Sequence, residues 1–125
     1  VLSLIQITLG TQVRQLIDKI ALSLNHIQRN LWVDLIGTTF KVHRSFAISL
    51  VVANFALFYR NYKLKYRYQF VNFICLVVFL EVLSGIILTY FDMLALMQPI
   101  HLIMASLLFL LQIALYFQLR QSKPN

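Results

Sequence analysis

Three long runs without charge limit what this chain can fold into. Residues 45–59 and 93–119 contain no Asp, Glu, Lys or Arg, and residues 70–91 contain only Glu81. A helix that crosses the hydrocarbon core of a bilayer needs about 20 mostly apolar residues. We therefore expect three transmembrane helices, at residues 39–60, 68–90 and 98–119.

The composition also indicates a membrane protein. Hydrophobic residues make up 60% of the 125 residues and charged residues only 12%, whereas a soluble domain carries roughly 25% charged residues. This composition excludes a disordered chain, and it argues against nucleic acid as a partner despite the net charge of +7. The single cysteine, Cys75, excludes an internal disulfide and a zinc–cysteine cluster. The lipid bilayer is the expected partner.

The N-terminal part of the chain differs from the three runs. Residues 1–9 are apolar but span only about 14 Å at 1.5 Å per residue, less than a hydrocarbon core of about 30 Å. We expect a partial helix at residues 1–10, in a chain that is a fragment of a longer membrane protein. The expected fold is an all-α integral membrane protein in a single domain, a bundle of three full transmembrane helices and one partial helix.

Residues 11–38 are expected to form an outer loop. Apolar residues recur there at helical spacing, with charged residues between them. This pattern is typical of an amphipathic helix lying on the membrane surface with Trp32 at the interface. It is equally typical of an amphipathic helix packed on other protein, and the sequence leaves both open.

The basic residues favour one orientation. Six of them follow the first and third expected spans, with no acidic residue among them: Arg60, Lys63, Lys65, Arg67, Arg120 and Lys123. The other five are spread over a much longer stretch that also contains Asp18, Asp34 and Asp92. The positive-inside rule predicts that loop 60–67 and the C-terminus face the cytoplasm of a bacterial cell or, as the alternative, the mitochondrial matrix.

Two histidines are expected at matching depths. His43 and His101 lie about 6 Å and about 5 Å from the outer ends of two spans that run in the same direction. Such a pair can offer neutral imidazole nitrogens to both faces of a haem, as axial ligands of its iron. In the alternative, both are interfacial residues bonded to lipid headgroups. The cations that could meet the haem propionates are Arg44, Lys41 and, from the outer loop, Arg14 or Arg29.

Three further polar residues fall deeper in the expected spans. A lone carboxyl at Glu81 is expected to be buried, protonated and bonded to a neighbouring helix, although a proton carrier or a group that tunes a cofactor is the functional alternative. Asn54 and Gln112 fall at similar depth on two different helices. An interhelical hydrogen bond between them is the simplest expectation.

Four motifs, in this order, resemble the haem A synthase family. They are LGTQVR at residues 9–14, Val42-His43-Arg44, EVLSGI at residues 81–86 and His101-Leu102. They match the end of the family's fifth membrane helix and parts of its sixth, seventh and eighth helices. A Gln commonly stands in the family where this chain has Glu81.

The resemblance implies a fold, a cofactor and a reaction. The family has two similar four-helix halves, and this chain resembles the C-terminal half, in which His43 and His101 would be the axial ligands of haem b. The full-length enzyme is an oxidoreductase that oxidises a methyl group of haem O to the formyl group of haem A for cytochrome oxidase assembly. The implied partners are the N-terminal half, haem O synthase and respiratory complexes. This half alone is expected to be inactive.

Other functions stay open on the residues themselves. The alternatives are a haem-carrying electron-transfer subunit and a haem-free structural subunit of a respiratory membrane complex. Some family members have a cysteine pair in the outer loop, and residues 11–39 contain none. The sequence has no glycine-rich phosphate loop, HExxH or nucleophile elbow, and it assigns no catalytic residue.

Overall fold

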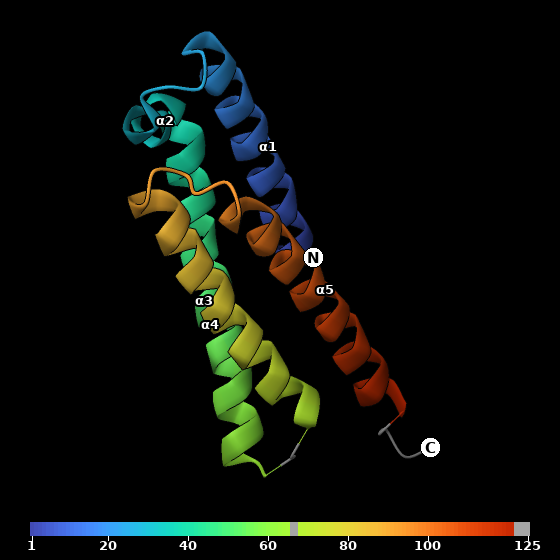
Figure 1. The fold of residues 1–125 in the computed structure, drawn as a ribbon. Helices are drawn as coiled ribbons and strands as arrows, with labels where there is room; N and C mark the ends of the chain where they lie inside the picture. The colour runs from blue at the N-terminus through green and yellow to red at the C-terminus, as the bar shows by residue number, and fades with distance from the viewer. Residues whose placement is uncertain (66–67, 122–125) are drawn as a thin grey trace.

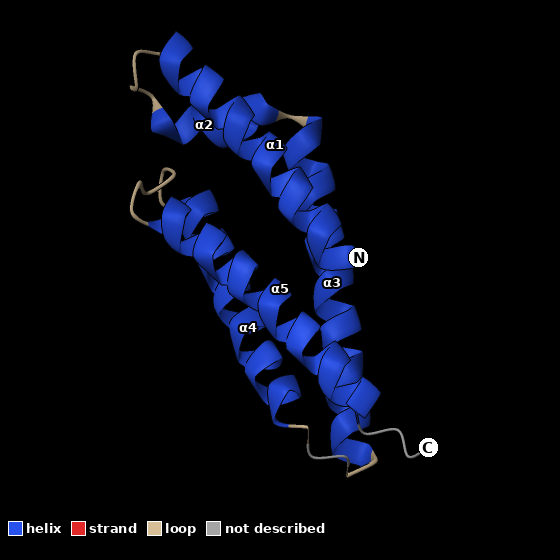
Figure 2. Cartoon of the chain, turned by 90° about the vertical axis from the view of Figure 1, so that its right-hand side faces the viewer, coloured by secondary structure: helices blue, strands red, loops and turns tan. Residues whose placement is uncertain are grey.

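The computed structural model describes residues 1–65 and 68–121, and all regular structure in them is helical (Figures 1 and 2). Arg67 and Lys123, two of the basic residues used to predict the orientation, lie outside the described residues. The five helices are α1 (Leu2–Ser23), α2 (Arg29–Ile36), α3 (Thr38–Lys63), α4 (Gln69–Tyr90) and α5 (Met97–Gln121).

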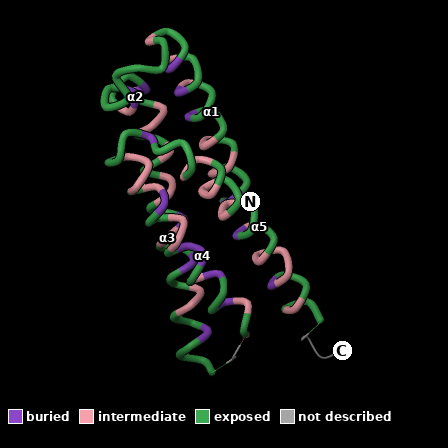
Figure 3. The backbone as a smooth tube through the Cα atoms, in the orientation of Figure 1, coloured by how far each residue is buried: buried purple, intermediate pink, exposed green. Residues whose placement is uncertain are grey.

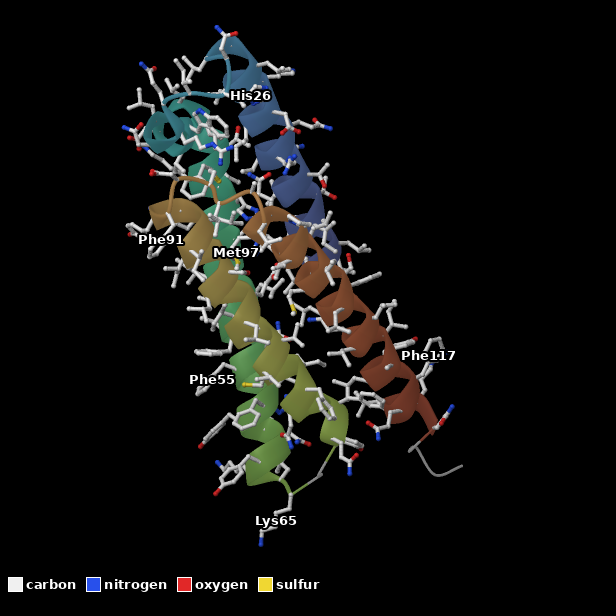
Figure 4. The ribbon with its side chains drawn as sticks, viewed as in Figure 1. His26, Phe55, Lys65, Phe91, Met97 and Phe117 are labelled. Carbon is white, nitrogen blue, oxygen red and sulfur yellow. The ribbon has the colours of Figure 1, made fainter. Side chains whose placement is uncertain are left out.

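Three of these helices are long and apolar enough to cross a membrane, namely α3, α4 and α5. Their ends fall within one helical turn of the ends expected from the sequence. Few of their residues are buried (Figure 3), and the side chains of Phe55 and Phe117 lie on their outer faces (Figure 4). Apolar outer faces of this kind suit helices that contact lipid, so the expectation of an all-α membrane fold is confirmed.

Helix α1 differs from the expectation, because it does not end near Gly10 but continues to Ser23. The hydroxyl groups of Thr8 and Thr11 donate to the carbonyls of the preceding turn and leave the helix intact. Beyond them, every fourth residue is apolar and buried, at Val13, Ile17 and Ala21. This buried stripe confirms the amphipathic helical spacing expected within residues 11–38, although the helix is a continuation of α1 and not a separate surface helix.

Helix α2 folds back and packs on α1. Trp32 is only 3% exposed, and its indole N–H donates to the carbonyl of Ile27 over 3.0 Å. Around it lies the outer core, made of Val13, Ile17, Ala21, Trp32, Ile36 and Met93. Of the two interpretations of residues 11–38, the structure therefore supports packing on protein. With the end of α1, α2 forms a lobe that extends beyond the α4–α5 connection (Figures 1 and 2).

The four long helices form a closed ring. Helix α1 packs on α3, α3 on α4, α4 on α5, and α5 on α1, so α3 and α5 lie on a diagonal. An inner core fills the space between α3, α4 and α5. It consists of Leu50, Val71, Ile74, Val77, Val78, Leu108 and Leu115.

A polar cluster links three of these helices. The Gln112 side-chain amide donates to Asn54 Oδ1 over 3.1 Å, which confirms the hydrogen bond expected from their matching depths. Asn54 Nδ2 in turn donates to the carbonyl of Leu50 over 2.8 Å, and the Ser3 hydroxyl donates to Gln112 Oε1. The cluster thereby connects α1, α3 and α5.

Gly37 makes the turn between α2 and α3 in a conformation that favours glycine. Its backbone angles are φ 66° and ψ −127°, a conformation that residues with a Cβ rarely adopt. A Cβ built on Gly37 meets nothing within 4 Å, so the strain in Gly37→Ala comes from the backbone alone. We expect this variant to lose about 1–3 kcal/mol of unfolding free energy, measured by denaturant unfolding in detergent.

The control for this prediction is Thr38→Ala, at the exposed first residue of α3. It adds no strain, so its unfolding free energy should stay close to that of the unchanged chain. Equal stability of the two variants would show that the turn does not depend on glycine.

Candidate functional site

Each of the two candidate ligand histidines lies in a small cluster between two packed helices. The α1–α3 cluster consists of Gln6, Gly10 and His43, and the α4–α5 cluster consists of Glu81, Ser84, Gly85 and His101. In both clusters the histidine lies near the beginning of the second of the two helices, His43 on α3 and His101 on α5. Because α3 and α5 run in the same direction on the diagonal of the ring, both histidines lie towards the same end of the bundle.

In the α1–α3 cluster, a glycine makes room for the imidazole of His43. A Cβ on Gly10 would lie 3.3 Å from Cε1 and 3.8 Å from Nδ1 of the ring. One turn earlier on α1, the amide nitrogen of Gln6 lies 3.3 Å from Nδ1 and 3.5 Å from Nε2. The same nitrogen donates to the carbonyl of His43 over 3.3 Å, so Gln6 holds both the ring and the backbone of this residue.

The α4–α5 cluster repeats this arrangement around His101. A Cβ on Gly85 would lie 3.5 Å from Cε1 of the ring. Glu81, one turn earlier on α4, brings Oε2 to 3.3 Å from Nδ1. The hydroxyl of Ser84 lies closer, 2.7 Å from the same nitrogen, and also lies 2.9 Å from the carbonyl of Glu81.

The two clusters share a four-residue spacing that was not predicted from the sequence. In each, a residue with an amide or carboxyl group precedes the glycine by four positions, as Gln6 precedes Gly10 and Glu81 precedes Gly85. Residues four apart lie on one face of a helix, which explains why both meet the histidine. The signal was present in the sequence, but it could be recognised only once Gln6 was known to face His43.

Buried oxygens beside both histidines lack hydrogen bonds. Gln6 Oε1 and Glu81 Oε2 are buried and have no hydrogen-bond partner among the described residues. The 3.3 Å contact of Glu81 Oε2 with His101 is short enough for an ion pair, but the better-formed bond of Nδ1 goes to Ser84. Buried polar atoms without partners are costly, and they mark both clusters as places that can accept a further group.

Within residues 1–65 and 68–121, no group of three or more His, Cys, Asp or Glu residues could hold a metal ion. Two imidazoles alone make a poor site for a bare transition-metal ion. They are sufficient as the axial pair of an iron that already has four macrocycle nitrogens.

The candidate cations are not all near the histidines. Arg44 is exposed, and its guanidinium lies 5.9 Å from the ring centroid of Phe40 on its own helix. Lys41 is also exposed and lines a shallow cleft on the outer face of α3. No contact links either cation to the two clusters among the described residues.

Arg14 is connected to the histidine end of the bundle. It follows Gly10 by one turn of α1, donates to Asp18 over 3.0 Å and also donates to Gln98, which precedes His101 by three residues. It lines an outer cleft of about 370 Å³ together with Asp18, His26, Arg29, Trp32 and Gln98, among others. Of the cations considered, Arg14 is therefore tied most directly to the helix that carries His101.

Comparison with known proteins places the chain in a family. No significant match was found among curated proteins or among solved structures. The model of the COX15-CtaA family, described as cytochrome oxidase assembly protein, matches residues 1–113. This match includes both histidine clusters and most of α5, so the chain belongs to this family of cytochrome oxidase assembly proteins.

Proposed function

We propose that this chain is the haem b-binding C-terminal half of a haem A synthase. That enzyme is an oxidoreductase which oxidises a methyl group of haem O to the formyl group of haem A. The observation that carries the proposal is the pair of histidine clusters, with His43 and His101 at the same end of two diagonal helices. Membership of a cytochrome oxidase assembly family supports the same function.

The residues present fit a haem between α3 and α5. Gly10 and Gly85 leave space for the two imidazoles, and both clusters contain a buried oxygen with unused hydrogen-bonding capacity. When bound, haem b supplies one-electron chemistry at its iron. The chain would hold it with His43 and His101, while the apolar side chains of the bundle would keep water away.

For the propionates, we propose Arg14 in place of Arg44. Both arginines are exposed, but Arg14 lines the outer cleft and hydrogen-bonds to Gln98 on α5, whereas Arg44 stacks on Phe40 of its own helix. A guanidinium can bind a carboxylate through two parallel hydrogen bonds. Because Arg14 also pairs with Asp18, its side chain is already directed towards the cleft.

The proposed setting is a bacterial cell membrane, with the mitochondrial inner membrane as the alternative. The N-terminal half of the enzyme would be the main protein partner, and haem O synthase or a respiratory complex would be a further one. The substrate, haem O, would bind to the N-terminal half, so we assign no catalytic residue to this chain.

The ligand assignment is tested with His43→Leu and His101→Leu. We expect the purified chain, supplied with ferric haem b, to show the visible spectrum of a low-spin bis-histidine haem. Each substitution should abolish that spectrum without loss of membrane insertion, because one axial nitrogen is removed and leucine is favourable in lipid. The control is His26→Leu in the turn at the outer end of α1 (Figure 4). If both single variants kept the bis-histidine spectrum, the ligand assignment would be wrong. If the unchanged chain bound no haem b, the haem-free structural subunit would become the better interpretation.

Alanine variants of Gly10 and Gly85 can be compared for their binding of haem b. A Cβ at Gly10 would lie 3.3 Å from His43, which is tighter than most real contacts, whereas a Cβ at Gly85 would lie 3.5 Å from His101, an ordinary contact. Both alanine variants should favour the helix by about 0.8–1 kcal/mol. We expect Gly10→Ala to bind haem b more weakly than Gly85→Ala, measured by haem titration. A larger loss in Gly85→Ala would contradict this description of the two clusters.

The orientation is tested with reporter fusions. We expect a fusion after Arg120 to report the cytoplasmic or matrix side, because the basic residues concentrate there. A fusion in the outer turn, at residues 23–30, should report the opposite side. His26 in this turn and Lys65 in the α3–α4 connection lie at opposite ends of the molecule (Figure 4). An outward signal after Arg120 would reverse the orientation.

A further inference from the structure

We propose that Ser84 is a positioning residue for His101. The oxygen of its hydroxyl accepts a hydrogen bond from Nδ1–H of the ring. This bond keeps the lone pair of the imidazole on Nε2, where it can bind the haem iron. The inference rests on the proposed function, because it assigns a role to Ser84 in holding the same cofactor.

The hydrogen count at Ser84 determines which way the bond runs. A serine hydroxyl has one hydrogen and can accept two further bonds. The oxygen of Ser84 lies 2.9 Å from the carbonyl of Glu81 and 2.7 Å from Nδ1 of His101. Since a carbonyl can only accept, the hydroxyl hydrogen is directed at Glu81, and the imidazole nitrogen must be the donor.

The opposite arrangement would be unfavourable. If the Ser84 hydroxyl donated to Nδ1, its oxygen and the carbonyl oxygen of Glu81 would face each other at 2.9 Å with no hydrogen between them. Glu81 Oε2 lies farther away, 3.3 Å from Nδ1, and has no hydrogen-bond partner among the described residues. The tautomer with its hydrogen on Nδ1 is therefore favoured by Ser84.

This tautomer is the one required of an axial ligand that binds through Nε2. A neutral imidazole with its hydrogen on Nδ1 has its lone pair on Nε2. Hydrogen bonds to the second nitrogen commonly fix the tautomer and orientation of metal-binding histidines, and they raise the basicity of the ligand. Ser84 is suited to this role because it is only 5% exposed, so water does not compete strongly for the bond.

The corresponding contact at His43 is different. Gln6 presents an amide nitrogen, which is a donor, to that ring, and it lies at similar distances from both ring nitrogens. It does not select the Nδ1–H form in the way that the Ser84 oxygen does at His101. The inference therefore applies to His101, and the two axial ligands of the proposed haem are supported unequally.

The test compares Ser84→Ala with Ser84→Thr, which keeps the hydroxyl, and with Ser106→Ala as the matched control. The Ser106 hydroxyl donates to the carbonyl of Leu102 on its own helix, so its loss removes a similar local bond away from the clusters. The first readout uses the full 125-residue chain without haem, labelled with ¹⁵N at histidine. The ¹⁵N signals should show the Nδ1–H form of His101 in the unchanged chain, in Ser84→Thr and in Ser106→Ala, and a loss of this preference in Ser84→Ala.

The second readout uses ferric haem b as the probe. We expect Ser84→Ala to weaken haem binding by about 10-fold to 100-fold and to raise the midpoint potential, because a less basic ligand stabilises ferric iron less. Ser84→Thr should restore both properties. A helical circular dichroism spectrum shared by all variants would show that they remain folded.

Each outcome decides a different claim. If the unchanged chain binds haem b but Ser84→Ala has the same tautomer preference, affinity and potential, the inference about Ser84 is wrong and the proposed function stands. If the unchanged chain takes up no haem b, the proposed function and the role of Ser84 towards iron both fail. A Ser84→Thr variant that behaves like Ser84→Ala would show that side-chain shape, rather than the hydroxyl, is responsible.

Discussion

The cost of an unpaired polar group inside a membrane governs this structure. Lipid offers no hydrogen bonds, so each polar side chain within a span must find its partner in protein. The chain meets this requirement by directing its few deep polar residues between helices. Gln112 joins α5 to Asn54 on α3 and to Ser3 on α1, and Ser84 joins α4 to His101 on α5. The polar contacts thereby link α1, α3 and α5 through one cluster and α4 to α5 through another, while apolar packing fills the space around them.

The same requirement explains why the two histidine clusters resemble each other. An imidazole between helices needs space and a polar neighbour, and a glycine with an amide or carboxyl residue one turn earlier supplies both. Gln6 with Gly10 and Glu81 with Gly85 meet these needs on α1 and α4. The repetition gives two sites of similar shape but unequal chemistry, because an amide donor faces His43 and a hydroxyl group that accepts a hydrogen bond faces His101. Unequal support is a means of tuning a cofactor held between two otherwise similar ligands.

Much of the fold could be predicted because the bilayer imposes a length on hydrophobic segments. The runs without charge located α3, α4 and α5 within one turn, and matching depths were sufficient to pair Asn54 with Gln112. The end of the first helix was misjudged because its apolar run stops at Leu9 and charged residues follow, so that the residues beyond Gly10 were expected to form a separate outer segment. In this chain the threonines donate back to their own helix, and Gly10 packs against His43. Trp32 was ambiguous because indole suits both a membrane interface and a protein core.

The sequence by itself determined the number of spans, the residues available as ligands and the distribution of basic charge, since these depend on composition along one dimension. Only the tertiary structure decided which neighbours each side chain has. It placed Gln6 against His43 and Ser84 against His101, left Arg44 on Phe40, and connected Arg14 to α5. The physical reason is that the rotation of a helix about its axis is set by packing with other helices. A hydrophobic run that is apolar on all sides does not specify that rotation.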